Sequence, residues 1–384
     1  MARIAIDARM CAYRQGGIAS YTRRLATALA PELAARNHTF IVGYARRGLP
    51  ILPGDTPAHQ PRLWTPPHHR WERQTLPIEF LRLRPALVHS PDFIPIIGPW
   101  HTVTTVHDLD FVRHPDRLTP DAQRYYGQAA TAVHRADAII AVSHATRDDL
   151  ISLLGVDAGA IIVIHEAADP LFRPLNNNCD AKLEMHNGRH LPSRYFLMVG
   201  TIEPRKNHDT LLDAYAAYRR TAPEPIGLVV AGAEGWNAAA TTKRLREEPG
   251  VIWLGSAMPE VLRSLYHGAV ALMMPSWDEG FGLPVVEAMA SGTPVVVSTA
   301  RALIEVAGDA ALIVAPDDAR AWVAAMTALD QEPSRRAALR AMGYRQAARF
   351  SWARTARETA TLYDRVLATP RNSNGMRRRR HRAS

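Results

Sequence analysis

The sequence predicts an α/β protein with two doubly wound, parallel-sheet domains, and three observations lead to this fold class. The chain has 384 residues, more than a single hydrophobic core usually serves. Short apolar runs alternate with longer amphipathic segments, as expected of βαβ units. A polar segment with three prolines, residues 169–194, separates two such series. We therefore expect a first domain over 1–172, a linker over 173–190 and a second domain over 191–350.

The apolar runs and the amphipathic segments give the expected elements. The expected strands cover residues 4–6, 40–43, 87–89, 103–106, 138–142 and 161–164 in the first series, and 195–199, 227–231, 251–254, 270–274, 294–297 and 311–314 in the second. The expected helices include residues 21–36, 120–135, 208–220, 259–267, 284–290 and 351–367. In such folds ligands bind beyond the carboxyl ends of the strands, so the strand-to-helix loops are the places to search.

Composition and charge restrict the class of protein. Hydrophobic residues are 47% and charged residues 22%, an ordinary globular balance. Two cysteines are too few for a disulfide framework, which favours a reduced, cytosolic setting. No apolar run approaches the ~18 residues of a membrane span. Six of the nine excess positive charges are arginines in a tail over 369–384, which we expect to be disordered, either without a partner or touching an anionic surface.

The segment after the expected strand 270–274 holds two carboxylates eight residues apart. Glu279 lies in a loop and Glu287 in the helix that Pro284 is expected to start. Each ionised carboxylate accepts hydrogen bonds, as neighbouring sugar hydroxyls or a ribose diol would offer. Gly280 and Gly282 keep this loop thin enough for backbone donors to reach a ligand. The alternative is that Glu287 is a charge favoured by the helix dipole.

Three other strand-to-helix loops carry candidate groups. Arg205 and Lys206 follow strand 195–199 and suit a diphosphate, or else form a solvated basic turn. Gly17, in a Gly-Gly pair before a helix expected near Ala19 or Ser20, would let a phosphate approach, or marks a plain turn. His107 follows strand 103–106 and is either a hydrogen-bonding group for a sugar or a structural loop histidine. The nearby Asp108–Asp110 pair is typical of surface turns more than of a metal site.

Taken together, these motifs resemble the retaining glycosyltransferases of family 4 over roughly residues 1–367. The segment "EGFGLPVVEAMASGTPVV" fits the E-x7-E motif of that family at Glu279 and Glu287. The segments "GTIEPRKN", "VHDLDFVRHPD", "AVSHATRDDL" and the Gly-Gly-Ile loop at 16–18 match in the same order. The resemblance implies the GT-B fold, two facing Rossmann-like domains with a nucleotide sugar between them, and a C-terminal helix 351–367 that returns to the first domain.

The resemblance also implies roles for the candidate residues. Arg205, Lys206 and Gly17 would hold the donor diphosphate, Glu279 the transferred sugar and Glu287 the ribose. His107 would lie near the anomeric centre or near the primary hydroxyl of the sugar. The backbone of Phe281, Gly282 and Leu283 would face the phosphates or the sugar. Many members carry an arginine where this chain has Thr201, which leaves the placing of the first cation open. The cations would stabilise the departing diphosphate, so neither a metal nor a cofactor is expected.

The substrates follow from the same resemblance. Mannosyltransferases of polysaccharide and O-antigen assembly share the Glu-Pro-Arg-Lys-Asn pattern, so the expected donor is GDP-mannose and the acceptor a glycan or a lipid-linked sugar. We expect no nucleic-acid partner. Residues 66–85, basic and apolar, either meet a membrane surface or form a helix that packs on its own sheet. The expected location is the cytoplasm, with peripheral contact at the inner face of the membrane as one option.

Two other functions compete with sugar transfer. Another GT-B enzyme acting on nucleotide sugars, such as an epimerase, would share the fold and the nucleotide site without needing an acceptor. A non-enzymatic binder of anionic surfaces would act through the arginine-rich tail, although no nucleic-acid module or interleaved aromatic residues occur there.

Overall fold

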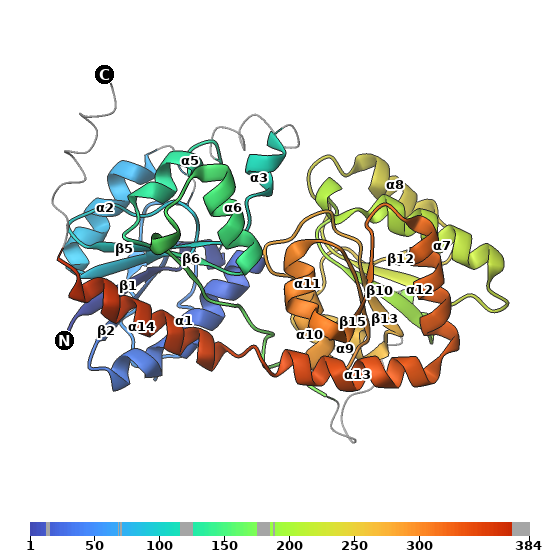
Figure 1. Ribbon diagram of the computed structural model, residues 1–384. Coiled ribbons are helices and arrows are strands. Elements are labelled where there is room, and N and C mark those ends of the chain that lie inside the picture. Colours follow the sequence, from blue (N-terminus) through green and yellow to red (C-terminus); the bar gives the residue numbers. More distant parts are fainter. Residues whose placement is uncertain are drawn as a thin grey trace. The chain divides into compact units, whose positions relative to one another are not determined.

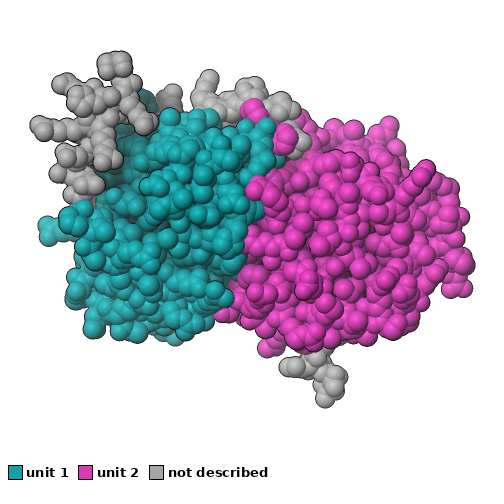
Figure 2. Space-filling model, in the orientation of Figure 1, with its two compact units in different colours: residues 1–113, 120–166, 352–384 teal, residues 114–119, 167–351 magenta. Residues whose placement is uncertain are grey.

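The computed structural model describes residues 1–12, 16–67, 69, 71–115, 126–174, 185–186 and 189–370. The chain divides into two compact units, coloured separately in Figure 2. Unit 1 comprises residues 1–113, 120–166 and 352–384, and unit 2 comprises residues 114–119 and 167–351. The arginines of the expected tail, from residue 371 onward, lie outside the described residues.

Unit 1 is built on a parallel sheet with helices packed around it (Figure 1), and its strand order is β3-β2-β1-β4-β5-β6-β7. The strands are β1 (Arg3–Asp7), β2 (Thr39–Ala45), β3 (Arg62–Leu63), β4 (Leu87–Ser90), β5 (His101–Val106), β6 (Ala138–Ala141) and β7 (Ile161–Val163). The central strands β4 and β5 are buried along their whole length, because helices cover both faces of the sheet.

The helices of unit 1 are amphipathic segments that bury one face on this sheet. They are α1 (Gly17–Ala35), α2 (Glu72–Leu83), α3 (Asp110–Arg113), α5 (Ala129–Ala132), α6 (His144–Leu154) and α14 (Trp352–Ala368), with short 3-10 turns at Arg9–Ala12, Val133–Arg135 and Ala158–Ala160. Helix α1 buries Tyr21, Leu25, Leu29 and Leu33, one residue per turn. The C-terminal helix α14 packs against α1.

A buried polar chain joins α14 to the sheet of unit 1. The Tyr363 hydroxyl lies 2.6 Å from Nδ1 of His89, and Nε2 of His89 lies 2.8 Å from the Thr105 hydroxyl. That hydroxyl also pairs with Tyr21 at 3.0 Å. Burial lowers the pKa of His89 to about 3, so the imidazole is neutral and each ring nitrogen has one partner. The C-terminal helix is therefore held in place by directional bonds as well as by packing.

Unit 2 repeats the doubly wound arrangement with strand order β12-β11-β10-β13-β14-β15. Its strands are β10 (Tyr195–Val199), β11 (Gly227–Ala231), β12 (Val251–Trp253), β13 (Ala271–Met274), β14 (Val295–Ser298) and β15 (Ala311–Val314), all paired in parallel. Its helices are α7 (His208–Thr221), α8 (Ala239–Glu247), α9 (Pro259–Gly268), α10 (Leu283–Ser291), α11 (Arg301–Ala307), α12 (Ala319–Gln331) and α13 (Pro333–Ala347), with 3-10 turns at Pro204–Lys206 and Gly308–Ala310.

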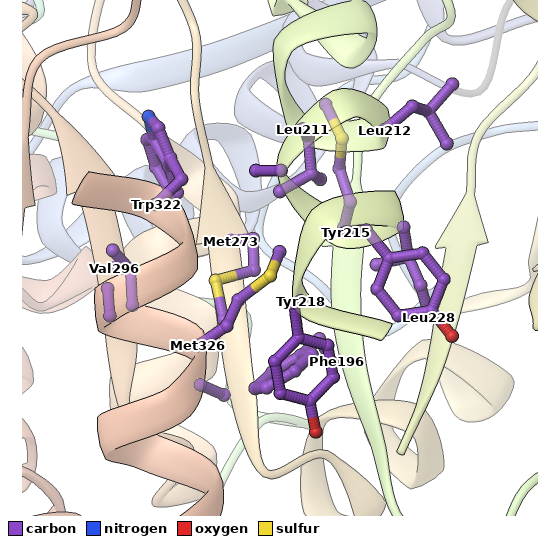
Figure 3. Packing of buried hydrophobic residues seen from close by; sticks show 14 of the residues in the cluster. Phe196, Leu211, Leu212, Tyr215, Tyr218, Leu228, Met273, Val296, Trp322 and Met326 are labelled. Atoms are coloured by element: carbon purple, nitrogen blue, oxygen red, sulfur yellow. The ribbon is translucent and has the colours of Figure 1, made fainter. Parts of the chain in front are cut away.

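Figure 3 shows the core between the sheet of unit 2 and the helices α7 and α12. Alternate residues of the strands, such as Phe196, Met273 and Val296, point into this layer, as a strand period of two requires. Trp322 of α12 belongs to this layer and is fully buried. This rigid base holds the loops at the carboxyl ends of β10 and β13.

Most expected strands and helices occur in the structure, with differences at their ends. Helix α1 begins at Gly17, two or three residues earlier than expected, because the Gly-Gly pair does not resemble a common helix start. The helix expected over 120–135 is seen only as α5 and a short 3-10 turn, and its first half lies outside the described residues. Part of the expected linker 173–190 instead forms a two-stranded antiparallel ribbon of β8 (Met185–His186) and β9 (Arg189–His190).

Residues 66–85 contain helix α2, which packs on its own sheet. Leu76 and Phe80 join the core cluster that includes Trp100. Of the two interpretations of this segment, packing on the sheet is therefore confirmed. The outer side of the same helix leaves Ile78 and Leu81 exposed.

Candidate active site

The candidate groups of unit 2 lie where its strand order reverses direction. The sheet grows from β10 toward β11 on one side and toward β13 on the other, and ligands in doubly wound folds bind outside this switch point. The loops that follow β10 and β13 are tied together there. The amide of Trp277 donates to the carbonyl of Arg205 at 2.9 Å, and the Asn207 amide group donates to the carbonyl of Pro275 at 3.0 Å.

Three predicted site residues meet in one ion cluster, defined here as Glu203, Arg205, Lys206, Ser276 and Glu279. Lys206 Nζ donates to Glu279 Oε1 at 2.6 Å, and Arg205 donates to Glu279 Oε2 at 3.0 Å. The Ser276 hydroxyl donates to Glu279 Oε1 at 2.8 Å. Arg205 also donates to Glu203 Oε1 at 2.9 Å. The two cations and the two carboxylates thus form one largely buried group of paired charges beyond the switch point.

The ion cluster determines the charge of Glu279. Its side chain is buried, and burial alone would raise its pKa, but the charges of Lys206 and Arg205 lower this pKa to about 2. Glu279 is therefore ionised at neutral pH. A carboxylate has about four lone-pair positions, and the cluster fills three of them. One position on Oε2 remains for a further donor, such as a sugar hydroxyl.

The helix α10 supplies the other donor-site candidates. Gly282 precedes the helix with a φ of +105°, and a side chain there would lie 2.7 Å from Leu303, so only glycine fits. Leu283 is the first helical residue, where backbone N–H groups lack partners within the helix and favour anions. The ring of Phe281 is buried against Phe350, 5.6 Å between centroids, so only its backbone is suited to meeting a ligand.

Glu287 lies one turn into α10 and is oriented by a buried tyrosine. The Tyr266 hydroxyl donates to Glu287 Oε2 at 2.9 Å. Burial and the Glu287 charge raise the pKa of Tyr266, so it remains a donor at all accessible pH. One carboxylate oxygen is therefore held by the protein. This fixed orientation exceeds what a helix-dipole charge alone requires, and it favours a binding role.

We expect Glu287→Gln to weaken donor binding more than it slows turnover. A hydrogen bond to a charged group contributes about 1.5–3 kcal/mol, so KM for the donor should rise about tenfold or more with a smaller change in kcat. Steady-state kinetics at varied donor concentration measure KM and kcat separately. Glu332→Gln on the surface serves as control. A fall in kcat at constant KM would contradict a ribose-binding role.

In unit 1, His107 follows β5 and is paired with a carboxylate that the sequence analysis did not identify. Its Nδ1 lies 2.9 Å from Glu166 Oε1, and its Nε2 lies 3.1 Å from the carbonyl of Pro91. Both partners are acceptors, so these two contacts favour the protonated ring over either neutral tautomer. Burial would lower the pKa of His107, but the hydrogen bond and charge of Glu166 raise it above the ordinary value.

Gly17 is the first residue of α1, and the space around it is open. A side chain at Gly17 or Gly16 would meet no protein atom within 4 Å, and neither residue has a positive φ. Nothing in the described part of the fold therefore demands glycine at these positions. A ligand that approaches this backbone closely would explain why glycine stands at these positions.

We expect Gly17→Ala to leave the fold intact and to impair catalysis. Alanine suits a first helical position, so the melting temperature should stay the same or rise slightly. If a diphosphate approaches this backbone, the added methyl group should raise the donor KM about tenfold. The check is thermal unfolding and kinetics side by side, with Gly54→Ala, also in open space, as control. Unchanged kinetics would remove Gly17 from the donor site.

Two further groups near the candidate site were not identified from the sequence. Glu166 and Glu203 each follow a parallel strand closely, which is the same rule that selected His107, but no neighbouring motif distinguished them.

The Asp108–Asp110 pair forms a local turn, in which the Asp110 amide donates to Asp108 Oδ1 at 3.3 Å. This arrangement is that of an ordinary turn, as the sequence analysis favoured.

Comparison with solved structures defines the class of fold. The chain superposes on the sucrose-phosphate synthase of Thermosynechococcus elongatus with a TM-score of 0.77 at 21% identity, covering 96% of this chain and 100% of that one. Two Rossmann-like units of this kind constitute the GT-B fold of glycosyltransferases. The predicted fold class is confirmed.

Sequence comparison then shows the family. "Glycosyltransferase Family 4" matches residues 15–170, and "Glycosyl transferases group 1" matches residues 183–346. An O-antigen chain mannosyltransferase B of Escherichia coli is 32% identical over 282 residues, covering 72% of this chain and 74% of that protein. A D-inositol 3-phosphate glycosyltransferase of Corynebacterium glutamicum (strain R) is 30% identical, covering 72% and 68%. This chain belongs to the family 4 glycosyltransferases.

Proposed function

We propose that this glycosyltransferase moves mannose from GDP-mannose to a glycan or lipid-linked acceptor, with retention of configuration and without a metal ion. The observation that carries the proposal is the ion cluster of unit 2, in which two cations and an ionised Glu279 lie together beyond a switch point. A diphosphate would lie against Arg205 and Lys206. Mannose follows from the likeness to the mannosyltransferase of Escherichia coli.

The chemistry of the step uses these charges. As the bond between the anomeric carbon and the diphosphate breaks, negative charge develops on the phosphate oxygens. Arg205, Lys206 and the amino end of α10 are fixed positive groups that would stabilise it. Glu279 would accept from hydroxyls of the sugar, whose ring gains positive charge. The acceptor oxygen would bond to the anomeric carbon on the face that the diphosphate leaves.

The test begins with thermal-shift measurements on GDP-mannose, UDP-glucose, ADP-glucose and dTDP-glucose. A donor raises the melting temperature by mass action, and at 100 times Kd the stabilisation is about 2.7 kcal/mol. We expect GDP-mannose to give the largest shift and to support transfer with EDTA present. Proton NMR of the product reports the anomeric configuration. An unchanged melting temperature with all four nucleotide sugars would overturn the proposal.

Peripheral membrane contact is part of the proposal because of the outer side of α2. The exposed side chains there and beside it are Trp64, Trp71, Ile78 and Leu81, together with the exposed Arg82. Aromatic and aliphatic groups beside cations suit the headgroup region of an anionic bilayer. No helix among the described residues is long and apolar enough to span a membrane. Sedimentation with phosphatidylglycerol vesicles, compared with phosphatidylcholine vesicles, tests this contact.

A further inference from the structure

The first turn of helix α14 makes two contacts that lead to the pair of His107 and Glu166, and all of these residues belong to unit 1. The chain leaves unit 2 at Ser351 and enters unit 1 at Trp352, where the helix begins. Further along the helix, Tyr363 anchors it to the sheet. The contacts of the first turn are additional to this anchor, and they lead toward the predicted reaction centre.

The first contact fixes the peptide group before Glu166. The Thr355 hydroxyl donates to the carbonyl of His165 at 2.7 Å. This carbonyl belongs to the peptide group whose nitrogen is that of Glu166, and a peptide group is planar. Thr355 and Glu166 are both buried. The hydroxyl therefore restricts the backbone that carries the carboxylate, whose Oε1 lies 2.9 Å from His107 Nδ1.

The second contact runs through the ring of Tyr21. This ring meets the His107 ring edge-on, with centroids 4.8 Å apart and planes at 84°, a geometry that aromatic pairs prefer. The same ring meets Trp352 of α14, with centroids 5.9 Å apart. Its hydroxyl pairs with Thr105 of the sheet at 3.0 Å. Tyr21 is thus held by the helix and by the sheet, and it limits the tilt of the imidazole.

Together these contacts determine the orientation of the His107 ring. Hydrogen bonds at both ring nitrogens set the direction of the ring, and the edge contact with Tyr21 sets its plane. The side chain of His107 is 17% exposed, so only a small part of the ring is open to a ligand. The titratable groups around the ring are Glu166, Asp92, Tyr21 and the neutral His89.

We propose that Thr355 and Tyr21 are positioning residues for sugar transfer, through which helix α14 holds the pair of His107 and Glu166 in its working orientation. This inference rests on the proposed transfer reaction, in which His107 lies near the anomeric centre. Both residues act through the pair, since Thr355 bonds to the backbone and Tyr21 is fully buried. A displacement of about 1 Å at a reacting group can slow a reaction about 100-fold, so small shifts of the pair are sufficient.

The first test compares Thr355→Val with Thr355→Ser. Valine keeps the shape of threonine and removes the hydroxyl, whereas serine keeps the hydroxyl. We expect Thr355→Val to lower kcat about tenfold with little change in donor KM, and Thr355→Ser to retain most of the activity. Thr359→Val is the matched control, because Thr359 is a buried threonine of α14 whose hydroxyl bond stays within the helix. Its kcat should equal that of the wild type.

The second test does not depend on transfer and follows the pKa of His107 by NMR of labelled histidine. His107→Gln assigns the signal. Glu166 raises the pKa of His107, and a loosened pair weakens this effect. The pKa should therefore fall in Thr355→Val and stay at the wild-type value in Thr355→Ser and Thr359→Val.

A second pair of variants, Tyr21→Leu and Tyr21→Phe, tests the ring contact and serves if Thr355→Val fails to fold. Leucine removes the ring, whereas phenylalanine keeps it and loses only the hydroxyl bond to Thr105. We expect kcat to fall at least about tenfold in Tyr21→Leu and to stay close to the wild-type value in Tyr21→Phe.

The outcomes separate this inference from the proposed function. Wild-type kcat and an unchanged pKa of His107 in Thr355→Val and Tyr21→Leu overturn the inference and leave sugar transfer standing. An equal loss of kcat in the control Thr359→Val also overturns it, because the effect is then one of general packing. If no nucleotide sugar supports transfer, the proposed function fails and positioning for transfer fails with it, whatever the pKa of His107 does. Losses that Thr355→Ser and Tyr21→Phe restore support both.

Discussion

Glu279→Gln should abolish sugar transfer while leaving the binding of free GDP intact. The substitution keeps the shape of the side chain but removes the negative charge that we propose faces the sugar. We expect kcat to fall about 100-fold or more, the scale found when one electrostatic group of an active site is lost. Lys206 then loses its carboxylate partner and Arg205 keeps only Glu203, so their attraction for a diphosphate should not weaken.

Two measurements on the Glu279→Gln variant separate the effect on sugar transfer from the effect on GDP binding. Calorimetric titration with GDP gives the affinity for the diphosphate, and single-turnover transfer gives the chemical step. Glu332→Gln, a half-exposed carboxylate on the surface of unit 2, controls for a general effect of lost charge. Transfer at the wild-type rate would remove Glu279 from catalysis, and lost GDP binding would show that its main role is to position the cations.

Glu279 also makes a pH-dependent contribution to stability. Its pKa is about 2 in the folded chain and about 4.3 in an unfolded one, so the folded state binds protons less readily. The stabilisation from this group is therefore fully present above about pH 4.3 and is lost as the pH falls through about 2. The difference in unfolding free energy between wild type and Glu279→Gln should shrink over this window. Denaturant unfolding at several pH values measures it.

Contacts between residues far apart in the sequence could not be predicted, because they depend on the order of the strands in the sheet and not on a local motif. The strands over 195–199, 227–231 and 311–314 are found as expected, because continuous apolar runs are typical of buried parallel strands. The contact between Lys206 and Glu279 was not predicted, although both residues were identified. They are 73 residues apart, and they meet because β10 pairs with β13 across the switch point.

The missed residues have the same explanation. Glu166 contacts His107 although the two lie 59 residues apart and belong to loops after different strands. A single sequence shows that both residues follow strands, and any carboxylate at such a position qualifies equally. Only the positions of the strands in the sheet select this pair. Helix α2 was uncertain for another reason, since Pro77 within it is unfavourable in helices and obscures the pattern.

Glu166→Gln should slow transfer and shift its pH dependence. Glu166 raises the pKa of His107, and glutamine at this position removes the charge that holds the proton against burial. His107 is predicted to lie near the anomeric centre, and its position and charge there depend on Glu166, so we expect kcat to fall at least tenfold. The basic limb of the pH–rate profile should move to lower pH, because the ring of the variant loses its proton more easily.

The direction of the pH effect distinguishes positioning from packing. A folded pKa of His107 above its unfolded value means that the ion pair stabilises the fold fully below about pH 6.5, and that this stabilisation disappears as the pH rises through the folded pKa. Wild type and Glu166→Gln should therefore differ more in unfolding free energy just below about pH 6.5 than above the folded pKa of His107. Glu32→Gln, which breaks a surface pair with Arg36, is the control. If Glu166 only fills space, kcat falls by the same factor at every pH and the basic limb stays where it is in the wild type.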